Sequence, residues 1–372
     1  MTKKFCNYLT SQLRFEYDVV SPCCWFFKKG NISNIDSYRK DLINISDWTP
    51  DCNYCKKLED QAITSPRQNS LNDPASFGLT ENSDEITALD IQIDADCNAA
   101  CLICGPYNSV TWQKHNMGNV SKATAGKIFN IKNDRTVDRR IKTIKSIVDF
   151  SKIKKIVFLG GEPFKSNSHL EILKCVPDLS KITISYVTNG SILPSAEVLE
   201  FIKQAKIVRL NISIDATEEQ FNYLRWPLQW KQVESNIKFL ENLRWPNLVL
   251  SFSHAVTPFN IFYYDRYVAW ARKTLTSNLA LIGFGNPFKS EGIINLSCIP
   301  PKLIDVLHSK YTGKMNSLHN MDNITALIDQ FDPIAYKKFI EYITLEDQKR
   351  NLNWREVFPE ISQYFTDDLL NT

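Results

Sequence analysis

The middle of the chain alternates between short apolar runs and longer segments in which apolar positions recur with the period of a helix. The apolar runs predict six strands, at residues 86–93, 155–159, 182–188, 206–214, 247–256 and 278–284. The periodic segments predict helices at about 136–150, 167–175, 195–204, 229–243 and 261–274. Such alternation is typical of an α/β fold with a parallel sheet. Six units predict a partial (β/α)6, TIM-like barrel with its functional residues at the carboxyl ends of the strands.

Two flanking regions differ from this pattern, so we expect three parts. Residues 1–80 are rich in turn formers and contain five of the ten cysteines, which predicts a Cys-rich module. Residues 62–84 are rich in Ser, Asn, Asp and Pro and predict a linker and loop. The barrel is expected over 85–285, and residues 286–372 predict a C-terminal helical extension. Its amphipathic segments lie near 301–311, 333–347 and 354–365.

Composition limits the class of protein. With 43% hydrophobic and 23% charged residues, the 372-residue chain is expected to form a packed core. A net charge of +3, from 44 basic and 41 acidic residues, gives no reason to expect a nucleic-acid partner. No apolar run approaches the ~18 residues of a membrane-spanning helix, and the first residues lack the apolar core of a signal peptide. We therefore expect a cytoplasmic protein without a membrane partner.

Cysteine usage indicates metal chemistry. In a reducing compartment ten cysteines are expected to serve as metal ligands before disulfides. Eight of them fall within the first 104 residues, and the isolated Cys175 and Cys298 are expected to be buried core thiols. Cys97, Cys101 and Cys104 follow the first predicted strand at spacings of four and three. Three thiolates on one loop can bind three irons of a cubane and leave the fourth iron open, whereas closed [4Fe–4S] sites use four cysteines.

Zinc is the alternative for this triplet. A zinc site needs a fourth Cys or His nearby, and the nearest histidine, His115, lies eleven residues beyond Cys104. The Cys-x3-Cys-x2-Cys pattern resembles the radical S-adenosylmethionine (SAM) enzymes. The resemblance implies that the open iron of a [4Fe–4S] cluster binds the amino and carboxylate groups of SAM. The reduced cluster of that family cleaves SAM to a 5′-deoxyadenosyl radical, which abstracts a hydrogen atom from a substrate.

The ends of the later predicted strands strengthen the resemblance. The second strand runs into Gly160, Gly161 and Glu162, which resemble the family's Gly-Gly-Glu motif for the SAM amino group. The fourth ends near Ser213 and Asp215, which the resemblance assigns to the SAM ribose; Asp215 can equally cap the next helix.

Three further residues of this region have candidate roles. Arg225 is a candidate for the SAM carboxylate, with a surface arginine as the alternative. Val256, after the fifth strand, is a candidate backbone contact to the adenine. His254 is either a hydrogen-bonding group at a strand end or a core histidine.

The N-terminal cysteines are numerous enough to supply a second metal site with four ligands. Their order resembles the auxiliary-cluster modules of radical SAM enzymes, SPASM and the shorter twitch domain, here placed before the SAM motif. The resemblance implies a second [4Fe–4S] cluster on Cys6, Cys23, Cys52 and Cys55. Cys24 competes with Cys23, and zinc is the alternative metal. A cluster with four cysteines has no open iron and would serve electron transfer or substrate contact.

We therefore expect a radical SAM enzyme. The resemblance implies a peptide or a small substrate, such as an amino sugar or a nucleoside-like molecule, and a flavodoxin- or ferredoxin-type reductant. No catalytic role is assigned to Cys24, Cys175 or Cys298. The alternative is a non-catalytic, zinc-stabilised binding protein, which would have no need for Gly160, Gly161 and Glu162 at a strand end. A SAM methyltransferase would need a Gly-rich turn after its first strand, which the chain lacks.

Overall fold

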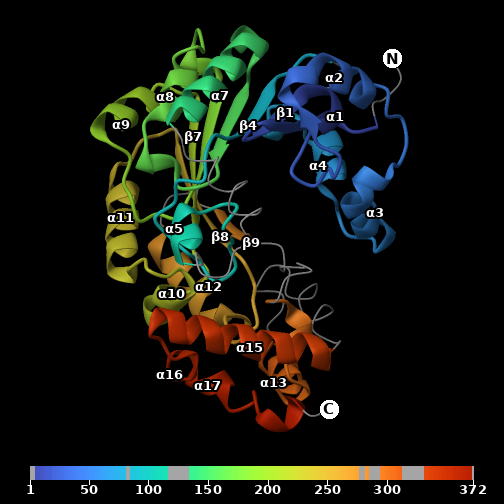
Figure 1. Cartoon of the computed structure of the whole chain (residues 1–372). Coiled ribbons are helices and arrows are strands. Elements are labelled where there is room, and N and C mark those ends of the chain that lie inside the picture. The colour runs from blue at the N-terminus through green and yellow to red at the C-terminus, as the bar shows by residue number, and fades with distance from the viewer. Residues whose placement is uncertain are drawn as a thin grey trace.

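A single sheet of nine strands organises the computed structural model, which describes residues 5–80, 84–115, 134–275, 281–284, 294–311 and 331–370. The strand order is β3-β2-β1-β4-β5-β6-β7-β8-β9 (Figure 1). The six strands from β4 onward are parallel and follow the chain, with the bounds Ala88–Gln92, Lys155–Leu159, Thr183–Thr188, Ile207–Ser213, Leu248–His254 and Leu281–Phe284. The predicted α/β fold with a parallel sheet is confirmed. Among the described strands β9 pairs only with β8, so the sheet is open.

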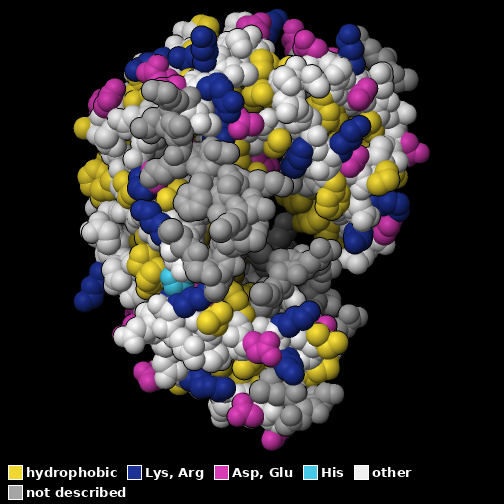
Figure 2. All heavy atoms as spheres, in the orientation of Figure 1, with side chains coloured by type: hydrophobic (Ala, Val, Ile, Leu, Met, Phe, Trp, Pro, Cys, Tyr) yellow, Lys and Arg dark blue, Asp and Glu magenta, His cyan; other side chains and the backbone are white. Residues whose placement is uncertain are grey.

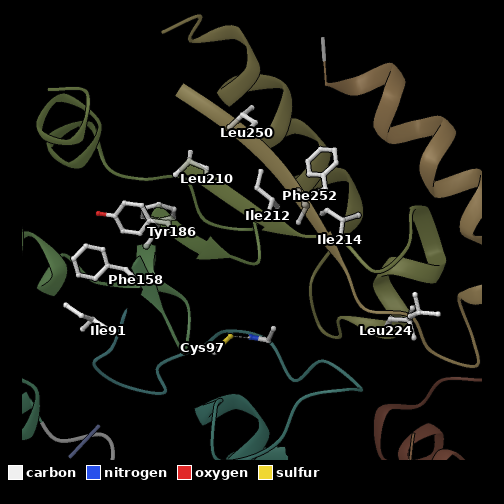
Figure 3. Packing of buried hydrophobic residues seen from close by; sticks show 14 of the residues in the cluster. Ile91, Cys97, Phe158, Tyr186, Leu210, Ile212, Ile214, Leu224, Leu250 and Phe252 are labelled. Carbon is white, nitrogen blue, oxygen red and sulfur yellow. Dashed lines mark hydrogen bonds between the residues drawn. The ribbon is translucent and has the colours of Figure 1, made fainter. Parts of the chain in front are cut away.

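Helices cover one face of this sheet (Figure 1). They are α7 (Asp134–Ile147), α8 (Ser168–Leu173), α9 (Ala196–Ile202), α10 (Glu218–Leu224), α11 (Trp230–Asn242) and α12 (Tyr264–Thr274). Every second strand residue packs against them, for example Leu210 and Ile212 (Figure 3). The Phe252 ring stacks on Trp270 of α12 with centroids 4.9 Å apart. The opposite face, which we call the inner face, carries the alternate residues.

The N-terminal segment belongs to the same sheet. Strand β1 (Gln12–Glu16) pairs in parallel with β4, with Leu13 opposite Leu89, and β2 (Val19–Ser21) and β3 (Gly30–Asn31) continue the sheet in antiparallel fashion. The helices of this segment are α1 (Asn7–Ser11), α2 (Ile35–Ile43), α3 (Asn53–Asp60) and α4 (Pro66–Asn72). Helix α4 lies where the sequence predicted a linker. Its first turn is closed by a capping box between Ser65 and Gln68, with Pro66 at the first position.

The C-terminal region is helical, as expected. It contains α13 (Pro301–Tyr311), α15 (Pro333–Arg350), α16 (Trp354–Val357) and α17 (Pro359–Ser362). Aromatic rings join it to the segment after β8, since Phe259 packs on Phe339 and Phe358 with centroids 5.3 and 5.0 Å apart. None of the helices in the described part of the chain is long and apolar enough to cross a membrane. Basic and acidic side chains are interspersed on the face shown in Figure 2.

Candidate functional site

The cysteine triplet lies on the loop after β4, at the carboxyl end of the parallel sheet. Backbone hydrogen bonds fix this loop to the end of α10 and the residues after it: the Ala100 and Leu102 amides donate to the carbonyls of Trp226 and Leu224, both at 2.7 Å. Helix α5 (Val110–His115) holds its other side, since the Trp112 indole donates to the Cys101 carbonyl at 2.7 Å. The loop is therefore held before any ligand binds.

Nitrogen donors point at the sulfur atoms of this loop. The side-chain amide nitrogen of Asn189 lies 3.8 Å from Sγ of Cys97, and the Arg225 guanidinium lies 3.9 Å from Sγ of Cys101. Burial raises the pKa of Cys97 to about 11 and that of Cys101 to about 12. Free thiols there stay protonated at neutral pH, whereas metal-bound cysteines are thiolates. Donors aimed at sulfur favour the thiolate, so the surroundings fit a metal cluster.

The Gly-Gly-Glu turn packs directly on the cysteine loop. Gly160 and Gly161 have φ values of +80° and +53°. A Cβ on Gly161 would lie 2.8 Å from the Asp96 amide nitrogen, closer than real side chains come. The Glu162 amide donates to the Asp96 carbonyl at 3.0 Å. Glycine is thus required here for the second strand end to contact the loop of the first.

Glu162 is a buried carboxylate that joins two strand ends. Its side chain accepts hydrogen bonds from the Thr188 hydroxyl and the backbone amide of Asn189, both at 2.7 Å. It also accepts one from the backbone amide of Phe164 at 3.2 Å. Only 3% of the residue is exposed. Burial raises its pKa to about 7, although these donors act in the opposite direction. The carboxylate has no cation within salt-bridge distance among the described residues.

Asp215 and Arg225 form a buried ion pair, 2.7 Å apart, beside the cysteine loop. Asp215 also accepts a hydrogen bond from the Ala255 amide at 2.9 Å, which places the buried Val256 next to it. Asp215 does not cap α10, because the residue before that helix is Thr217. Arg225 is buried, so the surface-arginine alternative is wrong. Ser213 lies at the same edge, 3.4 Å from the Ser253 hydroxyl.

His254 belongs to the core between the sheet and the helices. Its Nδ1 lies 3.0 Å from the Ile214 carbonyl, and its ring packs on Tyr267 with centroids 4.3 Å apart. Burial lowers its pKa to about 4, so the ring is neutral at physiological pH. Its side chain faces the helices, which favours the core-histidine alternative.

Four N-terminal cysteines line one apolar cavity, together with Trp25, Phe26 and Arg67. They are the predicted Cys6, Cys23, Cys52 and Cys55. Cys24 does not line this cavity and is exposed. Burial raises the pKa of Cys6 to about 11. All ten cysteines, each within the described ranges, are free thiols. No group of three or more Cys, His, Asp or Glu side chains in the described residues is spaced to hold a single metal ion.

A second group of contacts reaches the cysteine loop from the C-terminal helices, and the sequence did not predict it. Arg350 of α15 lies over the rings of Trp112 and Trp226, at 5.3 and 5.4 Å. It pairs with Glu346 at 2.8 Å, and Glu346 also contacts Nε2 of His115 at 3.0 Å. We call these five residues the α15 clamp. Its only sequence signal was the spacing of Glu346 and Arg350 by one helical turn.

Comparison with known proteins agrees with this site. A model of the radical SAM superfamily matches residues 92–262. These residues therefore match a domain of the radical SAM superfamily, a superfamily of enzymes. The cofactors of that superfamily are a [4Fe–4S] cluster and SAM, which fit the cysteine triplet and the polar groups around it.

Relatives of known name match about a third of the chain. A "Probable GTP 3′,8-cyclase" of Methanosarcina mazei is 28% identical over 136 residues, 37% of this chain and 35% of the relative. A "GTP 3′,8-cyclase" of Pelotomaculum thermopropionicum is 29% identical over 35% of each chain. The chain thus matches about a third of the length of these relatives.

Solved structures show more distant likeness. Native anSMEcpe with bound AdoMet is 18% identical with a TM-score of 0.36, over 69% of this chain and 60% of that one. Streptococcus suis SuiB is 12% identical with a TM-score of 0.40, over 77% and 58%.

Proposed function

We propose that this protein is a radical SAM enzyme with two iron–sulfur clusters, one in the barrel and one in the N-terminal segment. The observation that carries the proposal is the convergence of Cys97, Cys101 and Cys104 with Glu162 and the Asp215–Arg225 pair at one edge of the sheet. These groups follow the three strands β4, β5 and β7 and the helix α10. Bound together, a [4Fe–4S] cluster and SAM supply a 5′-deoxyadenosyl radical that abstracts hydrogen from a substrate.

The residues of the site supply binding and orientation. Glu162 is suited to an ammonium group, because its buried carboxylate is held by neutral donors. Arg225 has a buried Nε without a hydrogen-bond partner among the described residues and is suited to the SAM carboxylate. Ser213 and Asp215 are proposed to bind the ribose, and the Val256 backbone the adenine. Gly160 and Gly161 are proposed to let the backbone approach the amino group of SAM closely.

The N-terminal cavity is proposed to hold the second [4Fe–4S] cluster, on Cys6, Cys23, Cys52 and Cys55. In a cubane each cysteine binds a different iron, so the four sulfur atoms face one cavity without meeting around one ion. The four cysteines line one cavity, and their order resembles that of auxiliary-cluster modules, which supports a cluster; zinc stays the alternative metal. With no open iron, this cluster would serve electron transfer or substrate contact, as in a twitch or SPASM module.

The substrate is proposed to be a peptide or a small molecule of the amino-sugar or nucleoside type. The two GTP cyclases make a nucleotide a candidate, although they match only a third of their own length. A flavodoxin- or ferredoxin-type protein is proposed as the reductant. Ten free thiols favour a reducing, cytoplasmic compartment.

The test is SAM cleavage by anaerobically reconstituted protein under dithionite. Wild-type protein is expected to form 5′-deoxyadenosine, and Cys101→Ala to form none. Cys175→Ala is the matched control: Cys175 follows α8 and is partly buried rather than the buried core thiol expected from the sequence, and its Sγ contacts the Glu171 carbonyl. Equal product from wild type and Cys101→Ala, or none from wild type, would contradict the proposal.

A further inference from the structure

The inner face of the sheet is polar where a packed barrel would be apolar. Interiors of closed barrels are filled mainly by Val, Ile and Leu. Here the inner positions of β6 to β8 include the apolar Val187, Ile207 and Val249, but six others carry small polar or charged side chains. They are Ser185, Arg209, Asn211, Ser213, Ser251 and Ser253. The opposite positions of the same strands, such as Leu210 and Phe252, are fully buried against the helices. The inner face is therefore built to meet a polar ligand.

Two polar groups of this face lie side by side without partners. Ser185 and Arg209 are register neighbours on β6 and β7, so their backbones are about 4.8 Å apart. Nε of Arg209 and Oγ of Ser185 are buried, and neither has a hydrogen-bond partner in the described part of the chain. Ser185 is only 7% exposed. Buried donors of this kind are costly unless a ligand satisfies them.

Charge on this face favours a negatively charged ligand. Arg14 is neutralised by Asp90, at 2.8 Å, and Glu16, at 3.5 Å. Arg209 and Lys155 have no carboxylate within salt-bridge distance among the described residues. Lys155 lies nearer the amino ends of the strands, where its Nζ donates to the Ser76 carbonyl at 3.2 Å. Burial and the nearby Arg209 cation lower the pKa of Lys155 to about 8, against the effect of Asp90.

We propose that Arg209 and Ser185 bind an oxyanion of the substrate, a carboxylate or a phosphate, with Lys155 adding positive charge below them. The guanidinium provides a planar fork of donors for such a group. This inference rests on the proposed function, since it describes how that enzyme holds its substrate.

The position also limits the shape of the substrate. Arg209 lies four residues before Ser213 on β7, a rise of about 13 Å along the strand. Between them, Asn211 contacts the Ser251 hydroxyl at 3.3 Å and continues the polar lining. The hydrogen to be abstracted is therefore expected several bonds away from the bound oxyanion, toward the SAM edge.

The experiment is isothermal titration calorimetry on reconstituted, SAM-bound protein, with inorganic pyrophosphate and glutarate as probes. At least one probe is expected to bind wild-type protein and to bind Arg209→Gln about tenfold more weakly or worse, as loss of a charged hydrogen bond implies. Ser185→Ala, which changes little volume, is expected to weaken the same probe several-fold. Arg244→Gln is the matched control: Arg244 is exposed and lies 3.8 Å from Glu241. A preference for pyrophosphate indicates a phosphate-bearing substrate, and a preference for glutarate a carboxylate.

Two results would overturn the oxyanion site: no binding of either probe to wild-type protein at millimolar concentration, or equal affinity in wild type, Arg209→Gln and Ser185→Ala. The same wild-type preparation is assayed for 5′-deoxyadenosine, which separates this inference from the proposed function. Probe binding that depends on Arg209 without 5′-deoxyadenosine would contradict the function and keep the site. Formation of 5′-deoxyadenosine without Arg209-dependent probe binding would support the proposed function and contradict the oxyanion site.

Discussion

At the scale of single residues, Glu162 is a buried carboxylate with neutral hydrogen-bond donors and no cationic partner among the described residues. Three neutral donors hold its carboxylate, yet burial keeps its pKa near 7. A bound ammonium would favour the ionised form and lower that pKa. In the proposed role, the ionised carboxylate of Glu162 would attract the SAM ammonium group and the protonated one would not.

SAM affinity is therefore expected to depend on pH through Glu162. Below a pH of about 7, Glu162 of the SAM-free enzyme is increasingly protonated. The dissociation constant of SAM should therefore rise by up to about tenfold for each pH unit. Above that pH it should level off. Glu162→Gln should bind SAM weakly and lose this dependence, whereas Glu197→Gln, at an exposed position of α9, should behave as wild type. Calorimetric titration between pH 5.5 and 8 measures this; an unchanged pH profile in Glu162→Gln would exclude the role.

The individual motif residues were predictable, because Gly160, Gly161 and Glu162 have a fixed spacing and follow a recognisable strand. Their partners were not. The Asp215–Arg225 pair depends on α10, a short helix that the apolar pattern did not reveal. The groups that donate hydrogen bonds to Glu162, on Thr188 and Asn189, lie at the end of the neighbouring strand β6. No local sequence pattern indicates that they point toward Glu162.

At the scale of elements, helix α15 and the cysteine loop act as one unit. Glu346 and Arg350 are one turn apart on the helix and nearly fully buried, and the guanidinium lies over Trp112 and Trp226. Trp112 in turn holds the Cys101 carbonyl. The sequence predicted the helix within three residues at its end but not its contact, because the rings it meets lie more than a hundred residues away.

Arg350→Met is expected to destabilise the protein by about 3 kcal/mol, because it leaves Glu346 buried without its main partner. Iron bound after reconstitution should fall as well, although all three thiols remain. Urea unfolding and iron content are the measurements. The double variant Glu346→Gln/Arg350→Met should recover part of the stability. Lys238→Met, which breaks an exposed pair, should change it by less than about 0.5 kcal/mol; an equal loss there would contradict the clamp.

The end of β2 distinguishes two adjacent cysteines. Cys23 lines the N-terminal cavity and Cys24 does not. Cys23→Ser is therefore expected to lose the second cluster, about four irons per chain, while Cys24→Ser retains it. Iron analysis of the two single variants checks this, each serving as the control for the other. Loss of iron in Cys24→Ser alone would reverse the assignment.

At the scale of the whole molecule, one sheet joins the N-terminal segment to the barrel. The alternation of strands and helices predicted the six parallel strands, but β1 was missed. Its five residues, Gln-Leu-Arg-Phe-Glu, do alternate between polar and apolar, but the run is short and lies outside the repeat of strands and helices. Its pairing with β4 spans more than seventy residues of sequence, a relation that no local pattern contains.

Deletion of residues 1–80 should expose the edge of β4, with the buried Leu89 and Ile91 beside it. Exposed apolar edge strands associate, so the truncated chain is expected to aggregate rather than to form a working barrel. Size-exclusion chromatography measures this. A monomeric truncated chain that still binds SAM would show that the barrel is independent of the N-terminal strands.

The most direct test of the two-cluster account is the iron and sulfide content of anaerobically reconstituted protein. Wild-type protein is expected to bind about eight irons per chain, as two [4Fe–4S] clusters require. The Cys97→Ala/Cys101→Ala/Cys104→Ala variant should retain about four, and so should the variant with Ser at Cys6, Cys23, Cys52 and Cys55. About four irons in wild type, all lost in the first variant, would remove the second cluster. Zinc without iron in every form would contradict the account as a whole.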